Sequence, residues 1–220
     1  MHARPNSYLT MRKKIVLIAA IALAIAILLP AMQRTDAKSP ASLAAPPPME
    51  TVPVSKAVQA ERVKRGEYLV TIGSCDDCHT PWVVGAKGPA PDFSRRLSGH
   101  PSGLVMPEAP KLPNGPWVWI GAGTNTAFAG PWGVSYARNL TPEQVSGLGI
   151  WTEDMFIKTM RTGRHMGVSR PILPPMPWPS LSKATDEDLK SIFAFLRSLP
   201  PVKNEVPDPI IAEPPAQPAG

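Results

Sequence analysis

The residues with the clearest chemistry lie at positions 75–79, which read Cys75-Asp-Asp-Cys78-His79. They match C-x-x-C-H, the pattern for covalent attachment of a c-type haem. Two thiols one helical turn apart can form thioether bonds to the vinyl groups on one edge of a porphyrin, and the histidine that follows can bind the iron. The chain has no other cysteines. The motif therefore predicts one covalent haem c, with Cys75 and Cys78 as attachment residues and His79 as the proximal iron ligand.

Two other chemistries use the same residue types. A thioredoxin-like pair would make Cys75 and Cys78 a redox dithiol, with neighbouring charges tuning the pKa values of the thiols. That motif normally follows a strand, whereas the residues before Cys75 predict a helix. A zinc site would need a fourth ligand besides these two thiols and His79. The sequence contains no second Cys/His cluster to supply it, so the haem interpretation is favoured.

A methionine in a proline-rich stretch is the best candidate for a second iron ligand. Residues 170–180 read Arg-Pro-Ile-Leu-Pro-Pro-Met-Pro-Trp-Pro-Ser, so prolines with fixed φ flank Met176 on both sides. A thioether that must stay on the open face of an iron needs such a stiff backbone. Met176 is therefore predicted as the distal iron ligand. The alternatives are Met166, Met160, Met106, His100 and His165.

Three helices are predicted to position these residues. The first covers residues 58–74 and runs directly into Cys75. Within it Gly66 costs about 1 kcal/mol against Ala, which predicts a close approach by another element. The second covers residues 153–162, after an N-cap at Thr152 and before Gly163. The third follows the Thr-x-x-Asp capping box at Thr185 and ends at Pro200-Pro201; its apolar stripe is Leu189, Ile192, Phe193, Leu196 and Leu199.

Residues 80–136 are rich in glycine and proline, which excludes helix over most of this stretch. The run from Trp117 to Ile120 is the only strand-like one, and it predicts a short β-hairpin. A loop of this length inside a domain is usually functional or ordered by a ligand. We expect part of it to wrap the haem edge, and it could also serve as a docking surface.

The N-terminal region predicts export. Three basic residues at 12–14 precede an uncharged apolar run at residues 15–32, whose length lies between a signal peptide and a membrane anchor. Residues 1–37 are therefore a signal or membrane-anchor segment, and the poor cleavage site near residue 36 favours an uncleaved anchor. Positive charges before the run keep the N-terminus in the cytoplasm and send the remainder across the membrane.

The rest of the chain divides by composition. Residues 38–57 are a Pro/Ala-rich linker, residues 58–200 are the predicted domain, and residues 201–220 are a Pro-rich tail expected to be disordered. The chain carries a net charge of +6, but five basic residues against one Asp in residues 1–37 account for +4 of it. The exported part carries only +2, so no nucleic-acid partner is expected.

The order of these features resembles the class I c-type cytochrome fold over residues 58–200. That resemblance implies a mainly α, cytochrome c-like helical domain around one covalent haem, with long Pro/Gly-rich loops. It also implies that the first and last helices cross next to the haem, with Gly66 and Tyr68 meeting Phe195 and Leu196. Three further stretches look like the cytochrome subunits of bacterial periplasmic dehydrogenases: residues 139–142 (Asn-Leu-Thr-Pro), 162–166 (Thr-Gly-Arg-His-Met) and 175–178 (Pro-Met-Pro-Trp).

These observations predict a monohaem c-type cytochrome rather than an enzyme. It would carry single electrons in the periplasm between a dehydrogenase or quinol-oxidising partner and a terminal acceptor such as an oxidase. It would lie on the periplasmic side of the inner membrane, anchored by residues 15–32, or be soluble there after cleavage. The alternative is a haem enzyme or sensor with an open distal iron position. The single haem motif implies that any relay of several haems includes a partner.

Overall fold

The structure, a computed structural model, describes residues 55–112 and 115–212. The predicted leader at residues 1–37 and most of the predicted linker lie outside this part of the chain. No helix among the described residues is both long and apolar enough to cross a bilayer.

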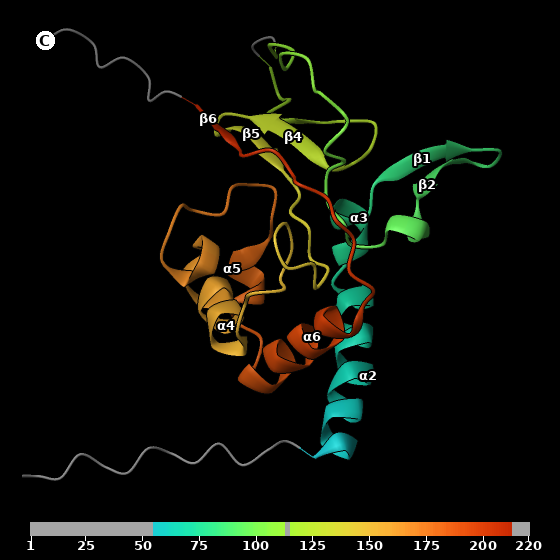
Figure 1. Cartoon of the computed structure of the whole chain (residues 1–220). Helices are drawn as coiled ribbons and strands as arrows, with labels where there is room; N and C mark the ends of the chain where they lie inside the picture. The colour runs from blue at the N-terminus through green and yellow to red at the C-terminus, as the bar shows by residue number, and fades with distance from the viewer. Residues whose placement is uncertain (1–54, 113–114, 213–220) are drawn as a thin grey trace, which may run out of the picture. The chain divides into compact units, whose positions relative to one another are not determined.

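The described residues form helices and two small antiparallel sheets (Figure 1). The sequence predicted a mainly α domain with one short hairpin, and the structure contains more strands than that. The elements in chain order are α2 (Lys56–Ile72), α3 (Cys75–His79), β1 (Trp82–Gly85), β2 (Gly88–Pro91), η1 (Phe93–Arg95), β3 (Ile120–Gly121), β4 (Ala127–Gly130), β5 (Gly133–Tyr136), α4 (Glu153–Thr162), η2 (His165–Gly167), α5 (Trp178–Leu181), α6 (Asp186–Ser198) and β6 (Ile210–Ile211).

The first and last long helices, α2 and α6, pack across each other, and Gly66 marks the crossing. A Cβ at this position would collide with the backbone carbonyl oxygen of Ser191 and would lie 2.7 Å from Cβ of Phe195. The close approach predicted at Gly66 is therefore confirmed. Only a glycine lets the two backbones come this near, which offsets its poor helix propensity.

The aromatic contact expected from α2 is not made by Tyr68. Its side chain is 55% exposed, whereas Val70 is fully buried. Val70 follows Gly66 by four residues, so the two share one face of the helix, while Tyr68 points to another. Phe195 and Leu196 are both buried, as expected for the other side of the crossing.

Helix α4 begins and ends at the predicted residues. Thr152 caps it by accepting a hydrogen bond from the Met155 N–H, and Gly163 ends it with φ at 63°. At α6 the Thr185 hydroxyl accepts from the Asp188 N–H, so the predicted cap is confirmed there too. One core cluster joins buried side chains of α2, α4 and α6: Val70, Phe156, Met160, Leu189, Ile192, Phe193, Phe195 and Leu196.

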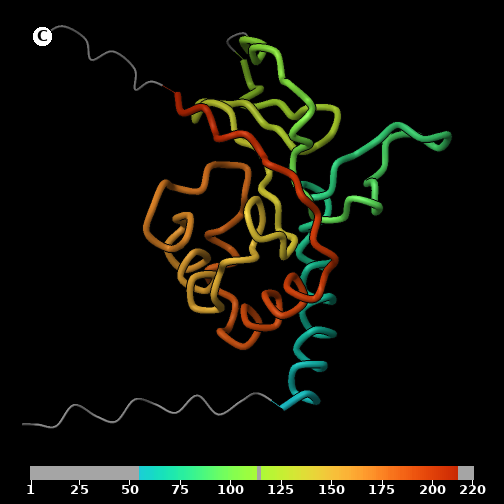
Figure 2. The backbone as a smooth tube through the Cα atoms, viewed as in Figure 1, coloured from blue at the N-terminus to red at the C-terminus, as the bar shows by residue number. Residues whose placement is uncertain are grey.

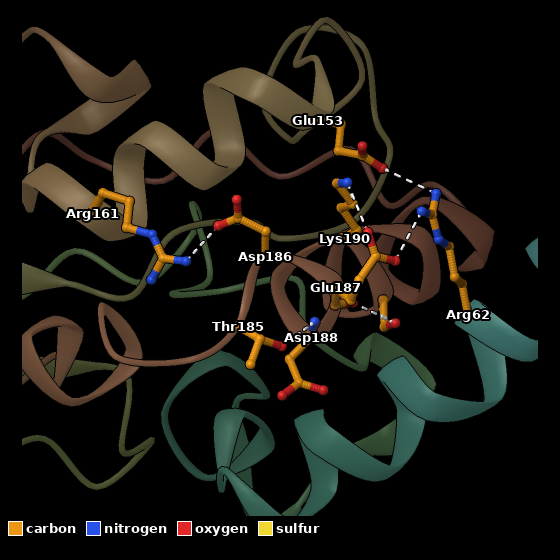
Figure 3. Close-up of polar contacts among 9 residues, drawn as sticks. Arg62, Glu153, Arg161, Thr185, Asp186, Glu187, Asp188 and Lys190 are labelled. Carbon is orange, nitrogen blue, oxygen red and sulfur yellow. Dashed lines mark hydrogen bonds and ion pairs between the residues drawn. The ribbon is translucent and has the colours of Figure 1, made fainter. Parts of the chain in front are cut away.

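Ion pairs on the surface connect the first turn of α6 to its neighbours (Figure 3). Glu187 pairs with Arg62 of α2 at 3.0 Å, and Arg62 also reaches Glu153 of α4 at 3.7 Å. Asp186 pairs with Arg161 of α4. Exposed pairs of this kind contribute about 0–1 kcal/mol each, so they orient the helices more than they stabilise them.

The glycine- and proline-rich stretch contains two sheets. The predicted hairpin exists, but its first strand, β3, includes only Ile120 of the run 117–120, and it pairs with β4. Strand β5 pairs with β4, and β6 adds to β5, which gives the order β3-β4-β5-β6. The hairpin of β1 and β2 was not predicted, because β2 contains two prolines.

The C-terminal segment differs from the predicted disordered tail over residues 201–212. It runs extended from the end of α6 to the sheet, where β6 is the edge strand (Figure 2). The buried Asn204 side chain holds it by donating to the Ser98 and His100 carbonyls and accepting from the Ser102 N–H. Such side-chain bonds order a proline-rich segment without requiring any regular structure.

Candidate functional site

The two cysteines lie on α3, a helix of five residues that directly follows α2. Ser74 has φ at 54°, and this left-handed residue turns the chain between the two helices. Cys75 and Cys78 are therefore one helical turn apart, as predicted, and His79 is the last residue of the same turn. Both cysteines are free thiols and both are half-buried.

The surroundings of the thiols oppose the thioredoxin-like alternative. Burial, together with the nearby Asp76 charge, raises the pKa of Cys75 to about 11. Burial and Asp77 also raise the pKa of Cys78. A reactive dithiol needs the opposite, because the thiolate is the nucleophile and a lowered pKa is what activates it. The raised pKa values of both thiols therefore argue against a reactive dithiol.

His79 is held in one orientation by the backbone. Its Nδ1 lies 2.7 Å from the carbonyl oxygen of Arg138, and since a carbonyl can only accept, Nδ1 carries the proton and donates. The ring is about nine-tenths buried, and burial lowers the pKa of His79. The neutral ring therefore has its lone pair on Nε2, the form that binds a metal.

The zinc alternative gains no support from the structure. Across residues 55–112 and 115–212, no three His, Cys, Asp or Glu side chains come together in a group able to hold a metal ion.

Met176 lies in the loop between η2 and α5. It is half-buried and packs against the same core cluster that Cys75 contacts from α3. The Ser135 hydroxyl of β5 donates to the Pro174 carbonyl at 2.6 Å, which attaches this loop to the sheet. Its role as iron ligand stays a prediction.

One alternative ligand, His100, has hydrogen-bond partners at both ring nitrogens. His100 is fully buried, with Nδ1 at 2.9 Å from the Thr126 hydroxyl and Nε2 at 3.1 Å from the Leu104 carbonyl. Both ring nitrogens are therefore engaged. His165 instead lies edge-on to Trp151, with ring centres 5.2 Å apart.

Comparison with curated proteins gives several cytochrome subunits of bacterial dehydrogenases. The gluconate 2-dehydrogenase cytochrome c subunit of Pantoea cypripedii is 31% identical over 64% of this chain and 24% of its own length. The cytochrome c subunit of the quinone-dependent alcohol dehydrogenase of Gluconobacter oxydans is 28% identical over 66% and 24%. The fructose dehydrogenase cytochrome subunit of Gluconobacter japonicus is 26% identical over 72% and 27%. The chain is similar to the cytochrome c subunits of bacterial dehydrogenases.

The similarity is to a part of those proteins. The chain spans about a quarter of the length of these cytochrome c subunits. No protein-family model matches the sequence.

The residues on α3 fit the haem that cytochrome c subunits carry. Two unpaired thiols one turn apart, on a helix whose final histidine keeps Nε2 free, form the donor set that a c-type haem requires. The fit rests on Cys75, Cys78 and His79.

Three residues around this cytochrome-like motif were missed by sequence reasoning. Arg138 supplies the carbonyl that orients His79, and its own guanidinium donates to the Val206 and Pro207 carbonyls. Arg96 pairs with Asp76 inside the motif, and Thr80 donates to the same carboxylate. No local pattern marks Arg138 or Arg96, because their partners lie far away along the chain.

Proposed function

We propose that this chain is a monohaem c-type cytochrome that carries single electrons between a dehydrogenase or quinol-oxidising partner and a terminal acceptor. The observation that carries the proposal is the hydrogen bond from His79 Nδ1 to the Arg138 carbonyl, at the end of a helix with two free thiols. This bond fixes the imidazole with Nε2 unprotonated, which is what an axial ligand of iron needs.

Each motif residue has one role in this proposal. Cys75 and Cys78 would form the thioether bonds to the haem, and His79 and Met176 would be the iron ligands. When bound, the haem supplies an iron that changes between Fe(III) and Fe(II). Burial of His79 keeps water from its ring, and a methionine ligand would raise the reduction potential of the iron.

We also propose a class I cytochrome arrangement for the domain. The crossing of α2 and α6 at Gly66, directly before the haem motif, supports it. So does the order of the elements, in which the motif follows α2 and Met176 precedes α6.

The proposed location is the periplasmic side of the inner membrane, with residues 15–32 as an anchor or a cleaved signal. The basic residues that precede this apolar run support export. The proposed partner is a dehydrogenase, because the relatives are named as subunits of such enzymes. Fractionation of cells and N-terminal sequencing of the exported protein would test the location.

Covalent haem is tested by expressing the full chain with the c-type haem maturation system. Wild-type protein should give a haem-stained band after denaturing electrophoresis, and replacing Cys75 and Cys78 by Ala should abolish it. A wild-type band without haem stain would refute the proposal.

The distal ligand is tested by spectroscopy of the oxidised protein. Met176→Ala should remove the weak sulfur-to-iron absorption band, whereas Met166→Ala, the matched control, should retain it. Rapid carbon monoxide binding to the reduced wild-type protein would instead favour the alternative function, a haem enzyme or sensor with an open distal position.

A further inference from the structure

We propose that Arg96 is a positioning residue for the haem-attachment helix. By pairing with Asp76, it holds α3 against α2 and α6 and cancels a negative charge next to the attachment cysteines. This inference rests on the proposed function, because it concerns how the chain holds and tunes a haem at α3.

The ion pair between Arg96 and Asp76 is bidentate. Nε of Arg96 lies 3.0 Å from Oδ1 of Asp76, and Nη2 lies 2.9 Å from Oδ2. The Asp76 side chain is 14% exposed and the Arg96 side chain 25% exposed. Two parallel charge-assisted bonds in a partly buried site fix geometry much better than a flexible surface pair does.

Thr80 completes the site from the other end of α3. Its hydroxyl donates to Oδ1 of Asp76 at 2.9 Å and accepts from the Leu97 N–H, also at 2.9 Å. Thr80 is fully buried. The carboxylate of Asp76 is thus hydrogen-bonded by the side chains of Arg96 and Thr80. Two successive residues, Arg96 and Leu97, therefore bind α3 and its C-cap residue Thr80.

The Arg96 guanidinium also reaches α2 and α6, the two helices that cross at Gly66. It lies 3.7 Å from a Glu67 oxygen of α2 and 5.2 Å from the ring centre of Phe195 of α6. Phe195 is the residue that packs on Gly66 at the helix crossing. A second ring, that of Phe93, lies 5.7 Å away. Arg96 therefore joins the haem motif to the helix crossing, as a cation held by rings and carboxylates.

This arrangement makes an electrostatic prediction that packing alone would not make. The pair is neutral as a whole, so removing one partner leaves the opposite charge next to the haem. Loss of Arg96 leaves Asp76 negative, which stabilises Fe(III) and lowers the reduction potential. Loss of the Asp76 charge leaves Arg96 positive, which raises the potential. Loss of both restores neutrality.

The experiment measures reduction potential and urea midpoint for the haem-loaded full chain at neutral pH. We expect Arg96→Met to lower the potential, Asp76→Asn to raise it, and the double variant to lie near wild type. We expect Arg96→Lys to keep a reduction potential near that of wild type, because lysine retains the positive charge. The variant should lose stability, because an ammonium group cannot form the bidentate pair with Asp76. If the Arg96→Met protein does not accumulate, the reduction potential of Asp76→Asn and the potential and urea midpoint of Arg96→Lys still test the proposal.

The matched control is the pair of Arg65 and Asp188, which joins α2 to α6 at 2.9 Å. Arg65 lies on α2, about 10 Å along the helix before its end at Ile72, so Arg65→Met and Asp188→Asn should shift the potential much less than the variants of Arg96 and Asp76. The inference is overturned if Arg96→Met and Asp76→Asn shift the potential in the same direction, or no more than the controls. Absence of covalent haem from wild-type protein would refute the proposed function instead.

Discussion

At the scale of single residues, a backbone carbonyl group fixes the orientation of the His79 side chain. The carbonyl that orients His79 belongs to Arg138, whose guanidinium donates to the Val206 and Pro207 carbonyls at 3.1 and 2.9 Å. The residue that holds the histidine is therefore held in turn by the C-terminal segment. That segment is fixed at its other end by Asn204.

Asn204→Ala should cost about 2–4 kcal/mol of unfolding free energy. The amide donates to the Ser98 and His100 carbonyls and accepts from the Ser102 N–H, so its removal leaves buried backbone groups without partners. Urea denaturation of the haem-loaded protein measures the loss. The exposed neighbour Lys203 is the control, and Lys203→Ala should change stability by less than about 0.5 kcal/mol. Equal effects of the two substitutions would contradict the role given to Asn204.

The placement of the motif residues on one helical turn could be predicted from sequence because it depends on adjacent positions alone. Cys75, Cys78 and His79 need only one helical turn to be placed correctly. The partner of His79 could not be predicted, since a backbone carbonyl carries no signal of residue type. Asn204 was missed for another reason: its proline-rich surroundings are typical of disorder, and the contacts that order it come from residues about a hundred positions earlier.

The helix crossing is the decisive contact at the scale of elements. Gly66→Ala would gain up to about 1 kcal/mol of helix propensity. The added methyl group would, however, collide with the Ser191 carbonyl and with Phe195, and overpacking of this kind typically costs about 1–3 kcal/mol. Because the collision is with backbone, which cannot move aside, we expect a net loss.

Thermal unfolding of the Gly66→Ala protein checks this prediction. Gly103→Ala is the matched control, because a Cβ at Gly103 meets nothing within 4 Å and its melting temperature should stay near that of wild type. A Gly66→Ala protein as stable as wild type would mean that α2 and α6 do not approach as the structure has them.

Elements were predictable where local signals and tertiary contacts agree. Thr152 and Thr185 cap helices as their sequence context predicts, because the cap bonds lie within three residues. The hairpin of β1 and β2 was missed because prolines argue against strands. The register pairs Pro89 with Val84, one step from the turn, where an antiparallel pair makes no hydrogen bond. The missing N–H groups of Pro89 and Pro91 therefore cost the hairpin nothing.

At the scale of the whole molecule, the pH dependence of stability follows from its buried histidines. Burial lowers the pKa values of His79, His100 and His165 below the ordinary value of 6.5. A histidine whose pKa is lowered by folding binds a proton more readily in the unfolded chain. Stability is therefore full above about pH 6.5 and falls as the pH decreases below it, until the folded pKa is reached. Carboxylates with lowered pKa values, such as Asp92, change the stability of the protein only near pH 4 and below.

His100→Gln should flatten this dependence. One proton bound only by the unfolded chain gives a slope of up to about 1.4 kcal/mol per pH unit, and Gln removes that proton while it keeps a donor and an acceptor near Thr126 and Leu104. Urea denaturation of the haem-loaded protein between about pH 7.5 and 5 should show wild type losing stability more steeply than the variant. Ser169→Ala, which removes a hydroxyl beside His165 and leaves His100 unchanged, is the control and should keep the wild-type slope. A His100→Gln protein with the full wild-type slope would mean that His100 can accept a proton in the folded state, and its two hydrogen bonds would then not hold the ring neutral.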